Sequence, residues 1–233
     1  MRPLALVALC FSALTALAGP VPPELAAALA AFRAEGTRGW AFTQTTSSDG
    51  KSLVERFEPL SRGPSHWTLL QKDGRAPTES ELADYRETQR RRGRVDSAPN
   101  VKDQIDPATC ELVSDDGTRA TWRFRLKPAD ADDRSAAHMA ATFTLHRPTA
   151  TIERVELANF EAFSPARLVA LTEARTIVTY TLTEPERPTL LATVTTRIRG
   201  KALWIKSLDS DLTVTYSDYV YAAKPPPSPT STP

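Results

Sequence analysis

The sequence predicts an α+β fold in which one large, curved antiparallel sheet of about nine to eleven strands carries two helices packed on one face. Three observations lead to this prediction. Most of the chain consists of short segments in which apolar and polar residues alternate, as in strands with one buried face. Turn signals such as Asp49-Gly50 and Asp116-Gly117 separate these segments by hairpin-length links. Only two stretches carry clear helix start signals, and both precede residue 100.

Residues 1–18 have the features of a secretory signal peptide. Arg2 provides a positive start, residues 4–17 are apolar, and residues 16–18 have the small-x-small form of a cleavage site. The apolar run is too short to span a membrane comfortably, although an uncleaved anchor is the alternative interpretation. We therefore expect a periplasmic or secreted protein whose mature chain begins near Gly19 and has no transmembrane span.

The charge balance argues against nucleic acid as a partner. The chain has 29 basic and 28 acidic residues, so removal of Arg2 leaves 28 of each and a formally neutral mature chain. Binding to phosphate backbones depends on a basic surplus, which this chain lacks. Of the two cysteines, Cys10 lies in the predicted signal peptide, so Cys110 has no internal disulfide partner and is expected to be a buried thiol.

No motif of a known reaction or metal site is present. The sequence lacks a G-x-S-x-G nucleophile turn and a glycine-rich phosphate loop. An unbroken strand would place His138 and His146 on one face, but no other ligand stands at zinc spacing beside them. Asp130, Asp132 and Asp133 resemble part of a calcium loop without its glycine and its final glutamate. We expect no catalytic residue, metal or cofactor.

The first predicted helix covers residues 22–35. Prolines precede it, alanines and leucines fill it, and Gly36 stands where a helix commonly ends. Leu25, Leu29 and Phe32 recur with the spacing of one helical face. This face is expected to pack on the sheet.

Three strands are expected next, at residues 40–46, 51–58 and 66–71. The second predicted helix, Glu79 to Arg92, then begins at Thr78 and Glu81, which have the spacing of a capping box. Acidic residues lie near its start, and the cluster Arg90, Arg91 and Arg92 ends it, which matches the helix dipole. The cluster therefore has a structural explanation. The alternative is a partner-binding patch for phosphate or lipid headgroups. Residues 93–104 are expected to form a loop.

The rest of the chain is predicted to be almost entirely strand, at residues 110–114, 118–127, 139–146, 151–163, 168–183, 189–199, 202–208 and 212–222. The last three segments are expected to form a meander, with Gly200 as the first break. In the segment 118–127, Trp122 and Phe124 alternate with arginines, so the two aromatic residues are expected to point to the core. A single domain is predicted over residues 19–223, followed by a disordered Pro/Ser/Thr-rich tail at 224–233.

Residues 25–70 resemble the N-terminal part of the periplasmic lipoprotein carriers LolA and LolB and of the related outer-membrane lipoprotein-sorting group. The shared order is a signal peptide, an amphipathic helix, a strand with aromatic-x-Gln (Phe42-Thr43-Gln44), a glycine-containing turn, a second strand, and a proline-containing loop before an aromatic strand with Trp67. The resemblance implies a half-barrel with helices over its open side and an apolar cavity that accepts acyl chains. The charged helix after the third strand departs from that pattern, and no acyl-contacting residue is transferred from the family.

The strand aromatics are the remaining candidates for a binding site. Alternation allows five of them to share one face of neighbouring strands, where they would line a ligand cavity: Trp40, Phe42, Trp67, Trp122 and Phe124. The leading hypothesis is thus an exported, non-catalytic cell-envelope protein that binds lipid, lipoprotein acyl chains or another amphiphile, or an envelope protein, in the concavity of the sheet. The alternatives are an envelope scaffold with a filled core and, less favoured, a hydrolase whose site residues escape recognition.

Overall fold

The computed structural model describes residues 19–32, 39–61, 66–91, 101–129, 133–203 and 205–222. The predicted signal peptide, the predicted tail, Gly36, Asp130, Asp132, Arg92 and Trp204 therefore lie outside the described residues, as does the side chain of Arg91.

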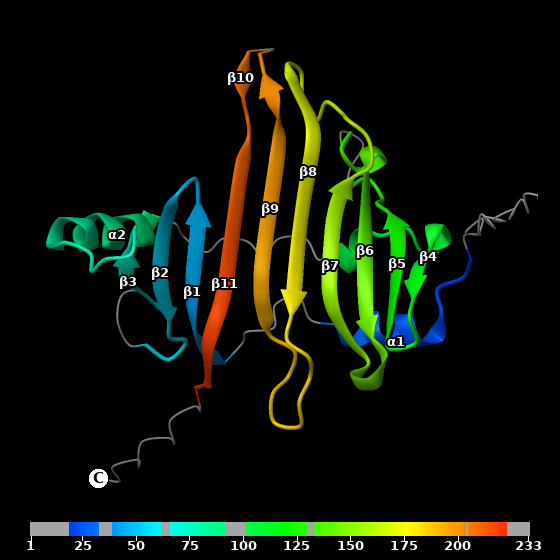
Figure 1. Cartoon of the computed structure of the whole chain (residues 1–233), viewed down its shortest axis with the longest axis horizontal. Helices are drawn as coiled ribbons and strands as arrows, with labels where there is room; N and C mark the ends of the chain where they lie inside the picture. Colours follow the sequence, from blue (N-terminus) through cyan, green and yellow to red (C-terminus); the bar gives the residue numbers. More distant parts are fainter. Residues whose placement is uncertain are drawn as a thin grey trace, which may run out of the picture.

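One antiparallel sheet dominates the structure (Figure 1). It contains eleven strands among the described residues, in the spatial order β3-β2-β1-β11-β9-β8-β7-β6-β5-β4, with the short β10 paired to β9. The sheet is open, with β3 and β4 as its two edges. The bounds are β1 Trp40–Ser48, β2 Lys51–Phe57, β3 Trp67–Lys72, β4 Glu111–Asp115, β5 Arg119–Arg125, β6 Met139–His146, β7 Thr151–Asn159, β8 Val169–Tyr180, β9 Leu191–Ala202, β10 Lys206–Ser207 and β11 Ser210–Tyr221. These observations confirm the predicted fold class and strand number.

The hairpin turns follow from local sequence. Asp49 and Gly50 both have positive φ, of 50° and 76°, and join β1 to β2. Two residues with positive φ form the tight turn that matches the twist of paired strands, and Asp-Gly adopts it readily. Asp73 and Gly74 repeat this combination after β3, with φ of 51° and 77°. The turn between β1 and β2 lies where the sequence predicted it.

Long-range pairing places the first and last strands side by side. β1 pairs with β11 over most of its length, from Trp40 opposite Tyr221 to Ser48 opposite Leu212. The chain between β3 and β4 connects the two opposite edges of the sheet and contains α2 (Glu79–Arg91) and α3 (Val101–Gln104). The short helix α3 lies within the segment that the sequence predicted as loop, so that prediction is wrong for its last four residues.

The first helix, α1 (Pro23–Ala31), is shorter than the predicted 22–35. Phe32 already has an extended backbone, with φ −61° and ψ 130°, although its N–H still donates to Ala28 O. The ring of Phe32 meets Tyr180 edge-on, with 5.1 Å between the ring centroids. This contact anchors the chain where it leaves the helix.

The predicted final meander is only partly present. β9 runs through Gly200 to Ala202 and pairs directly with β11, whereas the predicted middle strand is reduced to the two residues of β10. Gly200 is not a break between strands. A Cβ atom at this position would collide with the carbonyl oxygen of Ala170 on β8, so glycine permits the close approach of the two strands.

Both helices lie on the same face of the sheet, as predicted. The main core joins Leu25 and Ala28 of α1 to inward side chains of β5, β6, β7 and β8. On β2, Glu55 accepts a hydrogen bond of 2.7 Å from the Tyr85 hydroxyl of α2. Strand register, described below, places Glu55 on the same face as that core. We call this side of the sheet the helix-bearing face.

Three turns of 3₁₀-helix complete the described structure, at Pro107–Thr109, Ala136–His138 and Arg147–Thr149. Among the described residues, no helix is long and apolar enough to cross a membrane.

Candidate functional site

Strand register places the five predicted lining residues on the helix-bearing face. Trp122 stands opposite Phe143, and the same row continues across the sheet through Val155, Val178, Val194, Val214 and Thr46 to Leu53. Directly paired residues share a face, and side chains two positions apart do too. Phe124 therefore joins Trp122 on this face. Phe42 lies on the same face as Thr46, because both are on β1 and an even number of residues apart. Phe42 pairs with Phe57 of β2, and Phe57 pairs with Trp67 of β3, so Trp67 also lies on this face.

The five residues form two groups at opposite flanks of the sheet. Trp122 and Phe124 lie on β5, whereas the other three lie on β1 and β3, with β11, β9, β8, β7 and β6 between the two groups. A single small ligand therefore does not touch both groups at once. Sequence periodicity gave the shared face correctly but contains no information on this separation.

The first group is part of the main core beneath α1. Trp122 is 3% exposed and Phe124 is fully buried, and both belong to the cluster that includes Leu25 of α1. Phe124 meets Phe143 edge-on, with ring centroids 5.8 Å apart. A ligand reaches this group only if α1 moves away from the sheet, so a role in lining a cavity stays a prediction.

The second group is the centre of an aromatic cluster. Phe42 is 5% exposed and contacts both Trp67 and Phe57, with ring centroids 5.6 Å and 5.1 Å away. Trp40 and Trp67 are half-buried. Tyrosines of β11 extend the cluster, and their rings lie 5.4–6.4 Å from those of Trp40 and Phe42: Tyr216, Tyr219 and Tyr221. The sequence did not reveal this contribution, because it depends on the pairing of the first and last strands.

Between the two groups runs a band that we call the uncharged strip. It consists of the inward positions of β8, β9 and β11, namely Ala174, Thr176, Val178, Val194, Thr196, Ile198, Leu212, Val214 and Tyr216. Apart from Val214, these side chains are half-buried rather than buried. None of the nine is charged, and the two threonine hydroxyls bond to each other at 3.2 Å. The strip is thus an apolar surface with partial access to solvent.

Tyr216 at the end of the strip and its neighbours Tyr180 and Tyr219 stay neutral. Burial raises the pKa of Tyr180, Tyr216 and Tyr219 above the usual value for a phenol. The Tyr219 hydroxyl donates to Leu191 O at 2.8 Å. These groups therefore offer neutral hydroxyls, and no phenolate, at the border of the strip.

The opposite face of the same strands carries the charges. Arg154 and Arg175 both bond to Glu156 at 2.8 Å, and Arg197 bonds to Asp211 at 3.0 Å. Burial alone would raise the pKa of Glu156, but the two arginines outweigh it and lower that pKa. Charge is therefore segregated to the outer face, and the helix-bearing face of the central strands is left apolar.

The start of α2 forms the capping box that the sequence predicted. Thr78 N donates to Glu81 Oε2 at 2.8 Å, and Glu81 N donates to Thr78 Oγ1 at 3.3 Å. Glu81 also pairs with Arg75 at 2.8 Å and Lys72 at 3.0 Å. The hydrogen bonds from Arg75, Thr78 and Lys72 lower the pKa of Glu81 far below its usual range.

The arginine cluster at the other end of α2 is described only in part. Arg90 is exposed, and its guanidinium lies 3.8 Å from Glu87 one turn earlier. Exposed pairs of this kind contribute little to stability. The function of Arg90, Arg91 and Arg92 in partner binding stays a prediction.

The remaining polar candidates make ordinary structural contacts. His138 Nδ1 lies 2.9 Å from Glu161, and His146 Nδ1 lies 2.8 Å from Thr149 Oγ1. Within the described ranges, no group of three potential metal-ligating side chains comes together. Cys110 is buried, and burial raises the pKa of its thiol, which disfavours the reactive thiolate.

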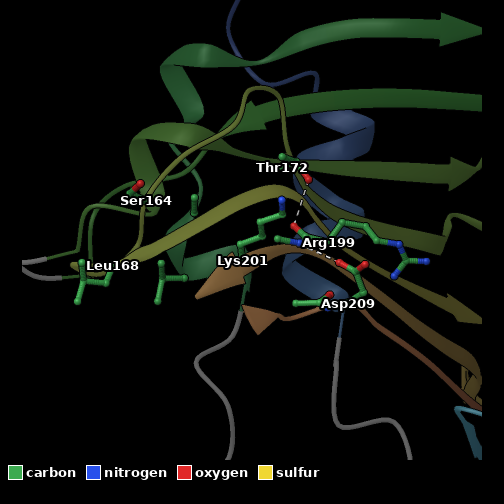
Figure 2. Close-up of a pocket in the computed structure, with 10 residues that line it drawn as sticks. Ser164, Leu168, Thr172, Arg199, Lys201 and Asp209 are labelled. Atoms are coloured by element: carbon green, nitrogen blue, oxygen red, sulfur yellow. Dashed lines mark hydrogen bonds between the residues drawn. The ribbon is translucent and has the colours of Figure 1, made fainter. Parts of the chain in front are cut away.

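A pocket that the sequence did not predict lies on the outer side of β8 and β9, near the start of β8 (Figure 2). Its volume is about 730 Å³. Leu168, Val169, Ala170 and Gly200 give it an apolar wall, and the polar lining comes from Ser164, Thr172, Arg199, Lys201, Ser207 and Asp209. The chain segment before β8 and the one before β11 meet here, so the pocket depends on contacts between distant parts of the sequence.

No protein-family model, curated protein or solved structure matches this chain.

Proposed function

We propose that this chain is an exported, non-catalytic protein of the cell envelope that binds a lipid, a lipoprotein acyl chain or another amphiphile along the uncharged strip. One observation carries the proposal: the central strands have an uncharged, half-buried inner face between two buried groups, while their outer face holds ion pairs. Monomeric proteins rarely leave such an apolar band accessible without a use for it. The signal-peptide features of residues 1–18 favour the envelope as the compartment.

The ligand is expected to lie along the strip with its polar end toward the aromatic cluster. The strip offers aliphatic side chains and threonines, which suit a hydrocarbon chain. The tyrosines at its border offer neutral hydroxyl groups, which can hydrogen-bond to an ester or a headgroup. Trp40, Phe42 and Trp67 would line this end of the site. Burial of an acyl chain contributes about 0.8 kcal/mol of binding free energy per methylene, so a modest length of hydrocarbon suffices for measurable binding.

Binding can be tested by displacement of a hydrophobic dye. The wild-type protein should bind the dye, and a soluble lipid should compete with it. Val194→Glu places a charge in the strip and should weaken dye binding at least about ten-fold, since an unpaired carboxylate opposes an apolar ligand.

The matched control is Thr195→Glu, the next residue of β9, which points to the outer face. It should leave dye binding unchanged. Native mass spectrometry of protein purified from the periplasm should show co-purified lipid in the wild type. If the wild type binds neither dye nor lipid, the ligand-binding proposal fails.

The second candidate is an envelope scaffold with a filled core. The complete burial of Phe124 and the near-complete burial of Trp122 favour it, because the space between α1 and the sheet is packed by side chains at that flank. In that case the exposed Arg90 at the end of α2 is the first candidate for a contact with an acidic partner surface.

A further inference from the structure

A second apolar surface lies at the end of the sheet where β8 begins and β9 ends. β8, β9 and β11 are the longest strands, with twelve residues each, and their ends project beyond the neighbouring strands (Figure 1). Three large aliphatic residues are exposed at this projection: Leu168 at 45%, Leu203 at 58% and Ile205 at 88%. We call them the apolar tip.

The backbone holds the tip in place. Leu203 N donates to Leu168 O at 2.8 Å, which connects the segment before β8 to the turn after β9. Both leucines have positive φ, of 70° and 52°, a region that L-residues with bulky side chains seldom occupy. Ile205 N closes the turn by donating to Ala202 O at 3.3 Å. These backbone hydrogen bonds thus hold Leu168, Leu203 and Ile205, whose apolar side chains are exposed, at the end of the sheet.

Cations surround the tip. Arg167 and Lys206 are exposed neighbours of the tip residues in the chain, and Lys201 lies on β9 directly opposite Ser207 of β10. Within the described part of the chain, none of these three side chains forms an ion pair. The one acid on the pocket wall, Asp209, accepts a hydrogen bond of 3.1 Å from Gly200 N. With three cations and this single carboxylate, the net charge of these side chains beside the tip is positive.

The pocket beside the tip adds hydrogen-bond donors (Figure 2). Ser164 and Lys201 line it with no hydrogen bond to another side chain in the described structure, and the hydroxyl of Ser207 accepts from Asp209 N while its proton stays available. Arg199, in contrast, is engaged by Asp211, Ile198 O and Ser210 O. The donors suit an anionic group that sits beside an apolar surface.

We propose that the apolar tip docks on the surface of an anionic lipid bilayer, with its aliphatic side chains in the interfacial layer and Lys201, Lys206 and Arg167 against acidic headgroups. A projecting tip of three side chains is too small for a stable protein interface, which needs roughly 800 Å² from each partner. Binding to a bilayer does not require an interface of that area, because apolar side chains insert into it individually and basic neighbours add electrostatic attraction. The pocket then faces the headgroup layer.

The test is co-sedimentation of the purified protein with vesicles of phosphatidylcholine alone or of phosphatidylcholine with one quarter phosphatidylglycerol. The wild type should bind the anionic vesicles, and high salt should weaken binding. Leu203→Ser combined with Ile205→Ser should reduce the bound fraction about ten-fold. Lys201→Gln combined with Lys206→Gln, which leaves only Arg167, should reduce the preference for the anionic vesicles.

The matched control is Leu112→Ser combined with Val113→Ser on the edge strand β4, where two aliphatic side chains are similarly exposed far from the tip. It should bind like the wild type. The proposal is overturned if the wild type stays in the supernatant, if the tip variant still binds, or if the control loses as much binding. Unchanged circular dichroism melting verifies that each variant is folded, and Ile205→Ser alone serves if the double variant is not.

Membrane docking by the apolar tip and ligand binding along the uncharged strip can be tested separately. The tip variants should retain the dye binding of the helix-bearing face, and Val194→Glu should retain vesicle binding, because the two surfaces lie on different parts of the sheet. Loss of one activity alone therefore identifies which proposal has failed.

Discussion

At the scale of single residues, the predicted lining residues differ in burial and therefore in whether a ligand can reach them. Phe124 has no exposed surface and is packed between Phe143 and the rest of the core, whereas Trp40 and Trp67 stay half-buried. The first kind of residue contributes packing energy. The second kind is accessible to a ligand without any movement of the fold.

Phe124→Leu tests this distinction. The substitution removes part of a fully buried ring, so the free energy of unfolding should fall by about 1 kcal/mol. Dye affinity should stay unchanged, because α1 and its neighbours cover the position. Urea denaturation and dye titration measure the two effects, and a weaker dye affinity with an intact fold would instead place Phe124 in the ligand site.

At the scale of elements, α2 is attached to the sheet at its first turn. Glu81 closes the capping box and pairs with Arg75 and Lys72, and Tyr85 reaches Glu55 of β2 one turn later. The remainder of the helix is largely exposed. The helix is therefore expected to depend strongly on the charge of one carboxylate.

Glu81→Gln removes the charge of this side chain but keeps the capping box, since glutamine can also form its hydrogen bonds. The folded-state pKa of Glu81 lies below its unfolded value, so its stabilisation is complete above about pH 5 and is lost as the pH falls through and below about 4. The variant should melt at a lower temperature than the wild type at pH 7. The difference should shrink progressively as the solution is acidified.

Glu79→Gln is the matched control, because Glu79 lies in the same first turn and forms no ion pair among the described residues. Its melting temperature should follow that of the wild type at every pH. A constant difference between wild type and Glu81→Gln from pH 7 to acid would show that the ion pairs are not the source of the stability.

At the scale of the whole molecule, one cluster of packed side chains lies at each flank of the open sheet, and the central strands between them are less covered. The main core joins α1 to β5, β6, β7 and β8, and the aromatic cluster lies on β1, β2, β3 and β11. β1 and β11 hold the second flank to the centre of the sheet. The apolar tip lies at the end of the central strands, away from both clusters.

The prediction of export concerns the whole chain, and it is checked by sequencing the N-terminus of the mature protein. Gly19 is expected as the first residue, because cleavage should follow the small-x-small site at residues 16–18. In the structure, Gly19 N donates to Cys110 O at 3.1 Å, a bond that the freed amino group can still form. Intact Met1 on periplasmic protein would refute the signal-peptide prediction.

The sequence by itself determined the fold class, the hairpin turns, the capping box and the inward face of each clear strand. These features have local causes: the two-residue period of a strand, the positive φ tolerated by Asp-Gly, and the reach of a side chain across one helical turn. They need no knowledge of distant contacts. The inward direction of Trp122 and the start of α2 are therefore both readable from a few neighbouring residues.

The tertiary structure alone decided which strands are neighbours. The pairing of Trp40 with Tyr221 joins residues at opposite ends of the chain, and such contacts depend on the collective free energy of the whole sheet. This pairing completes the aromatic cluster on β11, and four strands then separate the cluster from Phe124 on β5. It also places Leu168 against Leu203, which creates the apolar tip. Alternation fixes the face on which a side chain lies, but only long-range pairing determines its neighbours there.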